Sequence, residues 1–375
     1  MGIPFIDLGA QQARIRSRID AEIAEVLDSG AYVLGPKVKK FEEELAAFCG
    51  ARHVISCANG TDALMLGLMA YEIRGGDAVF VPSFTFAATA QVVPCMGAVP
   101  FFVDILPDTY NMDPASLKRS IAAARDMGLK PRMVIPVDLF GLPADMAAIQ
   151  KIADEEGLVV MCDSAQGFGA RIGNRMTGTF GKLTTTSFFP AKPLGCYGDG
   201  GAVFTDDSDL AALIDSYRIY GKGSDKYDNI RIGMNSRLDS IQAAILSVKL
   251  SIYAEEIELR DRVAARYNRL LKDHVTVPVV PEGYTSIWAQ YTVRVAGPEA
   301  RATAQAKLME QGIPTAVYYP IPQHLQTACS AFPGDPEGLP VTEEAAGQVL
   351  SLPMHPYLDE TTQDRIVEAL VGAIA

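Results

Sequence analysis

The chain has 375 residues, which is enough to bury a large core and to form two lobes. A hydrophobic fraction of 49% and a charged fraction of 21% are typical of a soluble globular protein. The formal net charge of −12 argues against nucleic acids and anionic membrane surfaces as partners.

The apolar runs, the cysteines and the histidines restrict the class of protein further. No apolar run reaches the ~20 residues of a membrane helix, and the N-terminus lacks a signal-peptide pattern, so we expect a cytoplasmic protein. The six cysteines are scattered without a C-x-x-C pair, which favours free thiols. The four histidines are too dispersed to form a metal cluster, so no metal site is predicted.

Strands and helices alternate along the first half of the chain. Apolar spacing predicts a helix over 14–28, a second over 37–48 and a first strand over 53–58. A turn at 59–61 leads to a helix over 62–71. The elements predicted next are strands at 78–81, 99–104, 133–137 and 158–162, with helices at 114–125 and 144–156. This alternation predicts an α/β fold with a mostly parallel sheet covered on both faces.

The second half begins with a polar, glycine-containing stretch over 221–233, which predicts a surface loop. A helical pattern then runs from Leu238 toward Lys272 and is long enough to bridge two lobes. We therefore expect a large domain over 1–250 and a smaller domain over 251–375. The smaller domain is predicted to contain a strand over 287–295, helices over 300–311 and 362–374, and an exposed loop over 332–340.

One lysine has an unusual setting. Lys192 follows an aromatic pair, lies between two prolines and precedes a glycine-rich turn. Poor solvation of its ammonium would lower its pKa and supply the neutral amine that a Schiff-base lysine needs. An ordinary loop lysine fits these residues equally well, so the local sequence leaves both interpretations open.

Polar residues stand at the ends of two predicted strands. Gly60 and Thr61 lie where a strand passes into a helix, a point at which free amides and the helix dipole bind anions, although such residues also occur in plain helix caps. Asp163 follows the strand at 158–162 and would face the ligand-binding edge of an open sheet. A carboxylate there can hold the protonated ring nitrogen of pyridoxal phosphate, or it can cap a helix.

Further candidates supply the other parts of such a site. Gln166 could contact the cofactor ring, Phe86 could stack on it, and Ser187 could reach a phosphate. Arg237 could pair with a carboxylate or a phosphate, although a solvated arginine is the simpler interpretation. A lysine, a carboxylate, an anion site and a stacking ring on one α/β framework are the parts of a pyridoxal phosphate site.

The chain resembles the DegT/DnrJ/EryC1/StrS sugar aminotransferases, a family of the aspartate aminotransferase fold type. The motifs that carry the resemblance occur nearly end to end and in the right order: Phe5–Leu8, Tyr32–Pro36, Ala58–Leu64, Pro82–Thr89, Asp163–Gln166, Ser187–Gly201, Met234–Leu238 and Tyr319–Pro322. The resemblance implies the fold type I of pyridoxal phosphate enzymes, with a large domain around a mostly parallel sheet and a smaller C-terminal α+β domain.

The resemblance also implies roles for individual residues. Lys192 would form the Schiff base with the cofactor, and Asp163 would pair with the ring nitrogen. The remaining cofactor contacts would come from Gly60, Thr61, Phe86, Gln166, Ser187 and, across a homodimer interface, Asn235. The substrate contacts would come from Arg237, Tyr318, Tyr319 and His324. Relatives with histidine in place of the lysine are dehydratases, and Lys192 argues against that branch.

Four segments resemble the enzymes that aminate UDP-2-acetamido-2-deoxy-3-oxo-glucuronate for bacterial surface polysaccharides such as O-antigen. These are Gln11–Ile15, Ser187–Pro190, Thr315–Val317 and Leu352–Leu358. L-Glutamate would donate the amino group, and pyridoxamine phosphate would be the intermediate form of the cofactor. Tyr318 departs from the family, in which histidine is common at this position. The alternatives are a 4-keto sugar aminotransferase acting on a dTDP- or GDP-sugar, and a non-catalytic regulator that binds pyridoxal phosphate.

Overall fold

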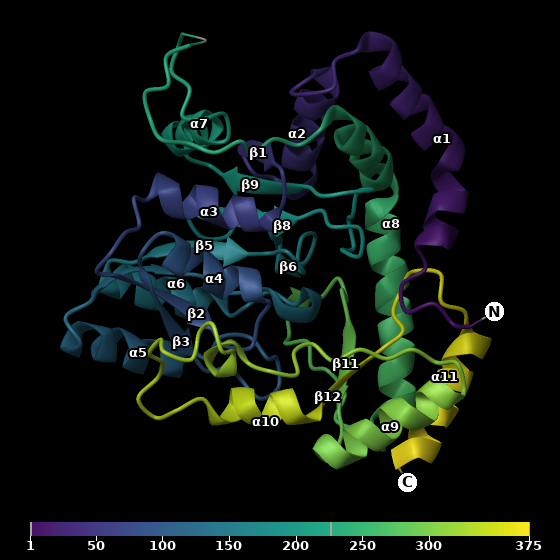
Figure 1. Cartoon of the computed structure of the whole chain (residues 1–375). Helices are drawn as coiled ribbons and strands as arrows, with labels where there is room; N and C mark the ends of the chain where they lie inside the picture. The colour runs from purple at the N-terminus through teal and green to yellow at the C-terminus, as the bar shows by residue number, and fades with distance from the viewer. Residues whose placement is uncertain (1, 226, 375) are drawn as a thin grey trace.

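Seven strands between His53 and Thr205 pair into one sheet of order β1-β9-β8-β5-β4-β2-β3 (Figure 1). They are β1 (His53–Cys57), β2 (Asp77–Pro82), β3 (Val99–Val103), β4 (Lys130–Val134), β5 (Val159–Asp163), β8 (Leu183–Ser187) and β9 (Gly201–Thr205). Of these described strands only β9 is antiparallel to its neighbours, so the predicted mostly parallel sheet is confirmed. The computed structural model describes residues 2–225 and 227–374.

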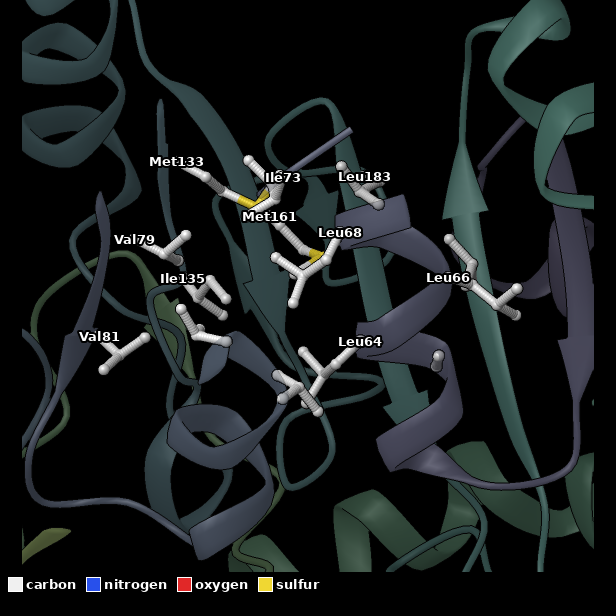
Figure 2. Packing of buried hydrophobic residues seen from close by; sticks show 14 of the residues in the cluster. Leu64, Leu66, Leu68, Ile73, Val79, Val81, Met133, Ile135, Met161 and Leu183 are labelled. Atoms are coloured by element: carbon white, nitrogen blue, oxygen red, sulfur yellow. The ribbon is translucent and has the colours of Figure 1, made fainter. Parts of the chain in front are cut away.

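Helices cover both faces of this sheet. Along β2, Val79 and Val81 belong to the same buried cluster as Leu64 of α3 (Gly60–Ala70), and Figure 2 shows this side of the sheet. The alternate residue Phe80 packs on the opposite side, in a core that includes Ile121. Burial on both faces explains why β2 reads as an unbroken apolar run rather than an alternating one. The other helices around the sheet are α2 (Pro36–Cys49), α4 (Ala87–Cys95), α5 (Pro114–Asp126), α6 (Met146–Glu156) and α7 (Ser208–Tyr217).

A second core lies at the far end of the long helix α8 (Ser240–Leu271), beyond the large sheet (Figure 1). Its two-stranded sheet pairs β11 (Tyr291–Arg294) with β12 (Val349–Leu352). The helices near this end are α9 (Pro298–Glu310), α10 (Pro340–Gln348) and α11 (Glu360–Ile374). In contrast, α1 (Leu8–Ser29) packs along the first half of α8, where Ile15 and Ile19 meet Ile245 and Val248. The domain boundary predicted at residue 250 falls inside α8 and stays a prediction. Within the described residues, no helix is both long and apolar enough to cross a membrane.

Three short strands and two short 3-10 helices complete the description. A small sheet joins β10 (Tyr284–Thr285), β6 (Arg171–Ile172) and β7 (Arg175–Met176), and the 3-10 turns are η1 (Leu139–Gly141) and η2 (Gln323–Leu325).

Two predictions for the second half of the chain were wrong. The strand expected over 287–295 begins only at Tyr291, because Trp288 adopts a φ of 52° and its amide donates to Ser286 Oγ. The loop over 332–340 is not fully exposed, since Asp335 is 5% exposed and pairs with Arg119. The Asp335 amide also donates to the carbonyl of Phe102, so this loop covers the outer edge of β3.

Candidate active site

Asp163 lies at the carboxyl end of β5, where the alternation of strands and helices predicted a ligand-binding edge. Its carboxylate is 5% exposed and accepts hydrogen bonds from Thr89 Oγ1 at 2.8 Å and from the Ala165 amide at 3.1 Å. Burial raises its pKa above the ordinary value, while these hydrogen bonds and the Lys192 ammonium act in the opposite direction. A buried carboxylate of this kind gains most from a cation placed directly against it. The protonated ring nitrogen of a pyridine cofactor is such a cation.

Lys192 is carried on the turn that follows β8 and is half-buried. Its amide donates to the Phe189 carbonyl at 2.8 Å, which holds the turn closed. Burial lowers the pKa of the Lys192 ammonium, and the charge of Asp163 opposes this change. The lysine can therefore supply a neutral amine at lower pH than a surface lysine can. Its side chain lines a small cavity together with Gln166 and Ser187.

The start of α3 forms an anion cradle against the end of β8. The Asn59 side chain caps the helix by accepting from the Asp62 amide at 2.8 Å. Gly60 and Thr61 are the first two residues of α3, so their amides have no acceptor within the helix. A Cβ at Gly60 would lie 2.7 Å from the Cβ of Ser187, so only glycine allows the helix start and Ser187 to meet this closely. Both amides and the Ser187 hydroxyl suit the phosphate of the cofactor.

Gln166 and two aromatic rings lie beside Asp163. Gln166 Oε1 accepts from the Phe140 amide at 2.8 Å, and its Nε2 donates to the Tyr319 hydroxyl at 2.9 Å. The Tyr319 ring lies 6.2 Å from that of Phe86, centroid to centroid. Phe86 is 56% exposed, although aromatic residues of this size are usually buried. An exposed ring beside a buried carboxylate is suited to stacking on a planar cofactor.

Asn235, predicted to contact the cofactor, and Arg237, predicted to contact the substrate, follow a surface loop. Asn235 is exposed and pairs with Ile219 through a β-bridge, and Arg237 is half-buried. The preceding loop protrudes from the body of the molecule (Figure 1). Its Ile232 is 90% exposed and its Ile230 54% exposed, so the loop presents apolar side chains outward.

Tyr318 and His324 occupy different settings. Tyr318 is half-buried, with its ring 6.4 Å from that of Phe5, and burial raises its pKa. His324 Nδ1 lies 2.7 Å from Ser83 Oγ, and its Nε2 lies 3.3 Å from a Glu343 carboxylate oxygen. Both ring nitrogens of His324 are thus engaged within the chain, so a contact with substrate would require one of these bonds to be exchanged.

Thr89 is a site residue that the sequence analysis did not single out. It ends the Pro82–Thr89 motif, and only the fold brings its hydroxyl on α4 within hydrogen-bond distance of Asp163. The cysteines agree with the prediction, because all six are free thiols. Within residues 2–225 and 227–374 no group of three or more His, Cys, Asp or Glu side chains could hold a metal ion.

A larger cavity of about 1070 Å³ is separate from these residues. It lies between α8 and the β6–β7–β10 sheet, and its charged lining residues are Arg171, Glu258, Asp261 and Arg262. Its lining includes none of the predicted site residues, so the chemistry is assigned to the smaller cavity at Lys192.

Comparisons with known proteins agree with this geometry. A model of the DegT/DnrJ/EryC1/StrS aminotransferase family matches residues 13–371. The chain is 48% identical over 371 residues to a UDP-2-acetamido-2-deoxy-3-oxo-D-glucuronate aminotransferase of Pseudomonas aeruginosa, covering 99% of this chain and 100% of that protein.

Solved structures give the same picture. A DegT DnrJ EryC1 StrS aminotransferase from Brucella abortus is 53% identical, with a TM-score of 0.97 and 99% of each chain covered. The structure of NtdA from Bacillus subtilis with bound cofactor PMP is 33% identical, with a TM-score of 0.86, and the match covers 96% of this chain and 81% of that one.

Proposed function

Since the chain belongs to the DegT/DnrJ/EryC1/StrS aminotransferase family, we propose that it transfers an amino group from L-glutamate to UDP-2-acetamido-2-deoxy-3-oxo-D-glucuronate. The family, the aminotransferase activity, the pyridoxal phosphate cofactor and the fold type predicted from the sequence are confirmed. The 48% identity over the whole chain is the observation that carries the choice of sugar.

Asp163 and Lys192 divide the chemistry between them. Bound pyridoxal phosphate supplies an electron-withdrawing ring that stabilises negative charge on the substrate carbon. Asp163 would keep the ring nitrogen protonated, because its buried carboxylate is stabilised as an anion by an adjacent cation. Lys192 Nζ takes the proton from the α-carbon of the amino donor and returns a proton at the end of the half-reaction. Its lowered pKa keeps the amine available for this transfer.

The remaining residues bind and orient. The amides of Gly60 and Thr61 and the Ser187 hydroxyl would hold the cofactor phosphate, and the exposed ring of Phe86 would contact the cofactor ring. Arg237 receives the carboxylate of the glutamate or of the sugar, which places a positive charge locally in a chain of net charge −12.

A second copy of the chain completes the site in this proposal. The protruding loop before Asn235 carries the exposed Ile230 and Ile232, and such side chains are suited to burial against a partner. We infer a homodimer in which Asn235 reaches the cofactor phosphate of the partner subunit.

The test uses the holoenzyme, ¹⁵N-labelled L-glutamate and the 3-oxo UDP-sugar. Mass spectrometry should detect the label in an amino sugar and 2-oxoglutarate as the second product. A dTDP-4-keto sugar is the matched comparator, and the proposal predicts at least about 100-fold lower kcat/KM with it, because a misplaced carbonyl loses most of the orienting contacts. Preferential labelling of the dTDP sugar would contradict the assignment of the substrate. Absence of label in every sugar would contradict the activity itself.

A further inference from the structure

The first half of α8 packs beneath the turn that carries Lys192. Two α8 side chains, two helical turns apart, bond to the backbone of this turn. Gln242 Oε1 accepts from the Tyr197 amide at 2.8 Å. Lys249 Nζ donates to the Gly195 carbonyl at 2.6 Å. Both hydrogen bonds therefore attach the backbone of this turn to one helix, α8.

Burying the ammonium of Lys249 beneath this turn costs free energy. Its side chain is 1% exposed, and its ammonium lies 4.3 Å from the centroid of the Tyr197 ring. Burial lowers the pKa of this ammonium to about 8, while Glu256, two turns further along α8, and the Cys196 thiol act in the opposite direction. An apolar side chain of the same length would fill this space without the cost of burying a charge. The hydrogen bond to Gly195 and the contact with Tyr197 are the interactions that offset that cost.

The turn above Lys249 has little freedom to adjust. A Cβ at Gly195 would lie 2.5 Å from the Pro190 carbonyl oxygen and 2.6 Å from that of Phe189, so the two sides of the turn are in contact at this point. The Cys196 amide donates to the Phe188 carbonyl at 2.8 Å and closes the turn. Lys192 lies in the chain between the two sides of this closed turn, so a shift of the Gly195 peptide would move the backbone that carries Lys192.

We propose that Lys249 is a positioning residue, which fixes the Gly195 peptide from α8 and thereby aims the Lys192 side chain. The importance of this for catalysis rests on the role proposed above for Lys192. Lys249 itself does not contact the reacting atoms. Because α8 continues from this turn into the second core, the same contact ties the lysine-bearing turn to the C-terminal half of the chain.

The first test measures the turn directly, in protein freed of cofactor. In Lys249→Met, hydrogen exchange at the amides of Lys192 and Cys196 should be at least about 10-fold faster, because each closing bond loses its support. The matched control is Tyr267→Phe, which also removes a buried bond from α8 to a backbone carbonyl, that of Pro353 at 3.1 Å, but in the second core. This control should leave both amides unchanged. Exchange in Lys249→Met equal to that of the wild type would overturn the proposal.

The second test is spectroscopic and uses the holoenzyme. In Lys249→Met the pH midpoint of the bound cofactor's absorbance should move to higher pH by about 0.5 or more. Lys192 gains access to water when the turn loosens, and this change favours its charged form. Lys249→Arg, which keeps a charged donor, should restore the midpoint at least in part, and Tyr267→Phe should not move it.

Different results would contradict the role of Lys249 and the role of Lys192. If Lys249→Met does not fold, the same pair of measurements is made on Lys249→Gln, which keeps an uncharged donor and should show a smaller change in the same direction. An unmoved midpoint in the folded variants would reject the role of Lys249. An absorbance band that survives in Lys192→Ala would instead reject the role of Lys192, whatever the exchange rates show.

Discussion

The proposed cofactor side of the site is buried and hydrogen-bonded, whereas the proposed substrate side lies beside an exposed loop. On the cofactor side, Asp163 and Gln166 are each 5% exposed, stand at or just after the end of β5 and have their polar atoms held by neighbouring groups. On the substrate side, Arg237 follows a protruding loop whose Ile232 is 90% exposed. In the proposed site, the cofactor residues are therefore fixed by contacts within the fold, whereas the proposed substrate residue Arg237 lies beside an exposed surface loop.

Replacing Lys192 should have the largest effect, because this residue is proposed to carry out the proton transfer on the cofactor side of the site. For Lys192→Ala we expect transaminase activity to fall by at least about 10⁴-fold, since no other amine is placed to move the proton. Steady-state assays of amino-sugar formation measure this. The matched control is Lys182→Ala, at an exposed lysine before β8, which should keep full activity.

Neutralising the carboxylate should loosen the cofactor while leaving the cradle for its phosphate intact. For Asp163→Asn we expect cofactor affinity to fall about 100-fold, which is about 3 kcal/mol, because an amide cannot hold the charge on the ring nitrogen. Fluorescence titration of the apoprotein with pyridoxal phosphate measures the affinity. Wild-type affinity in this variant would show that Asp163 does not face the ring.

On the substrate side we expect binding to change more than turnover. Arg237→Ala should raise the KM for the acidic substrate by about 10-fold to 100-fold and leave kcat within about threefold, the signature of lost ground-state binding. The matched control is Arg231→Ala, an exposed arginine in the same loop. A fall in kcat at unchanged KM would show that Arg237 acts in catalysis rather than in substrate binding.

The last expected effect is on stability rather than on activity and concerns a second carboxylate behind Asp163. Asp138 is 2% exposed, accepts hydrogen bonds from Ser164 Oγ and from the Ala144 amide, and has its pKa raised to about 7, mainly by burial. The folded state therefore binds a proton more tightly than the unfolded state does, so this group contributes stability that is full below pH 4 and is lost as pH rises toward 7.

In Asp138→Asn that pH dependence should disappear. In the wild type, stability should fall by at most about 1.4 kcal/mol for each pH step of about 1 across this range, which lowers the thermal midpoint by a few degrees. Thermal unfolding of the two apoproteins between about pH 4 and pH 8 measures the difference. Parallel curves would show that Asp138 stays in one protonation state throughout this range.

Much of the framework could be predicted from local sequence. Asp113 and Pro114 mark the start of α5, and the Asp113 side chain indeed caps the amides of Ala115 and Ser116. The alternation of strands and helices also placed Asp163 correctly at a carboxyl strand end. These signals are local, because caps and apolar periods act within a few residues of the chain.

The errors arose where distant segments decide the conformation. Trp288 leaves the extended region within an otherwise strand-like sequence, and Asp335 is buried only because Arg119 and β3 lie beside it. The helices α7 and α10 and the strand β12 were not predicted, because elements this short depend on tertiary packing more than on propensity. Lys249 was overlooked for the same reason, as a single lysine in an apolar helix period usually reaches solvent.

The sequence by itself determined the parts of the site: a lysine in a restricted turn, a carboxylate after a buried strand and a glycine at a helix start. It could do so because each part depends on neighbours within a few residues. Only the tertiary structure decided that Gly60 touches Ser187, that the charge of Asp163 acts on Lys192, and that Lys249 holds the Gly195 carbonyl. These pairs meet because the strand order β1-β9-β8-β5 and the packing of α8 bring them together, and such non-local contacts leave no mark in a local sequence pattern.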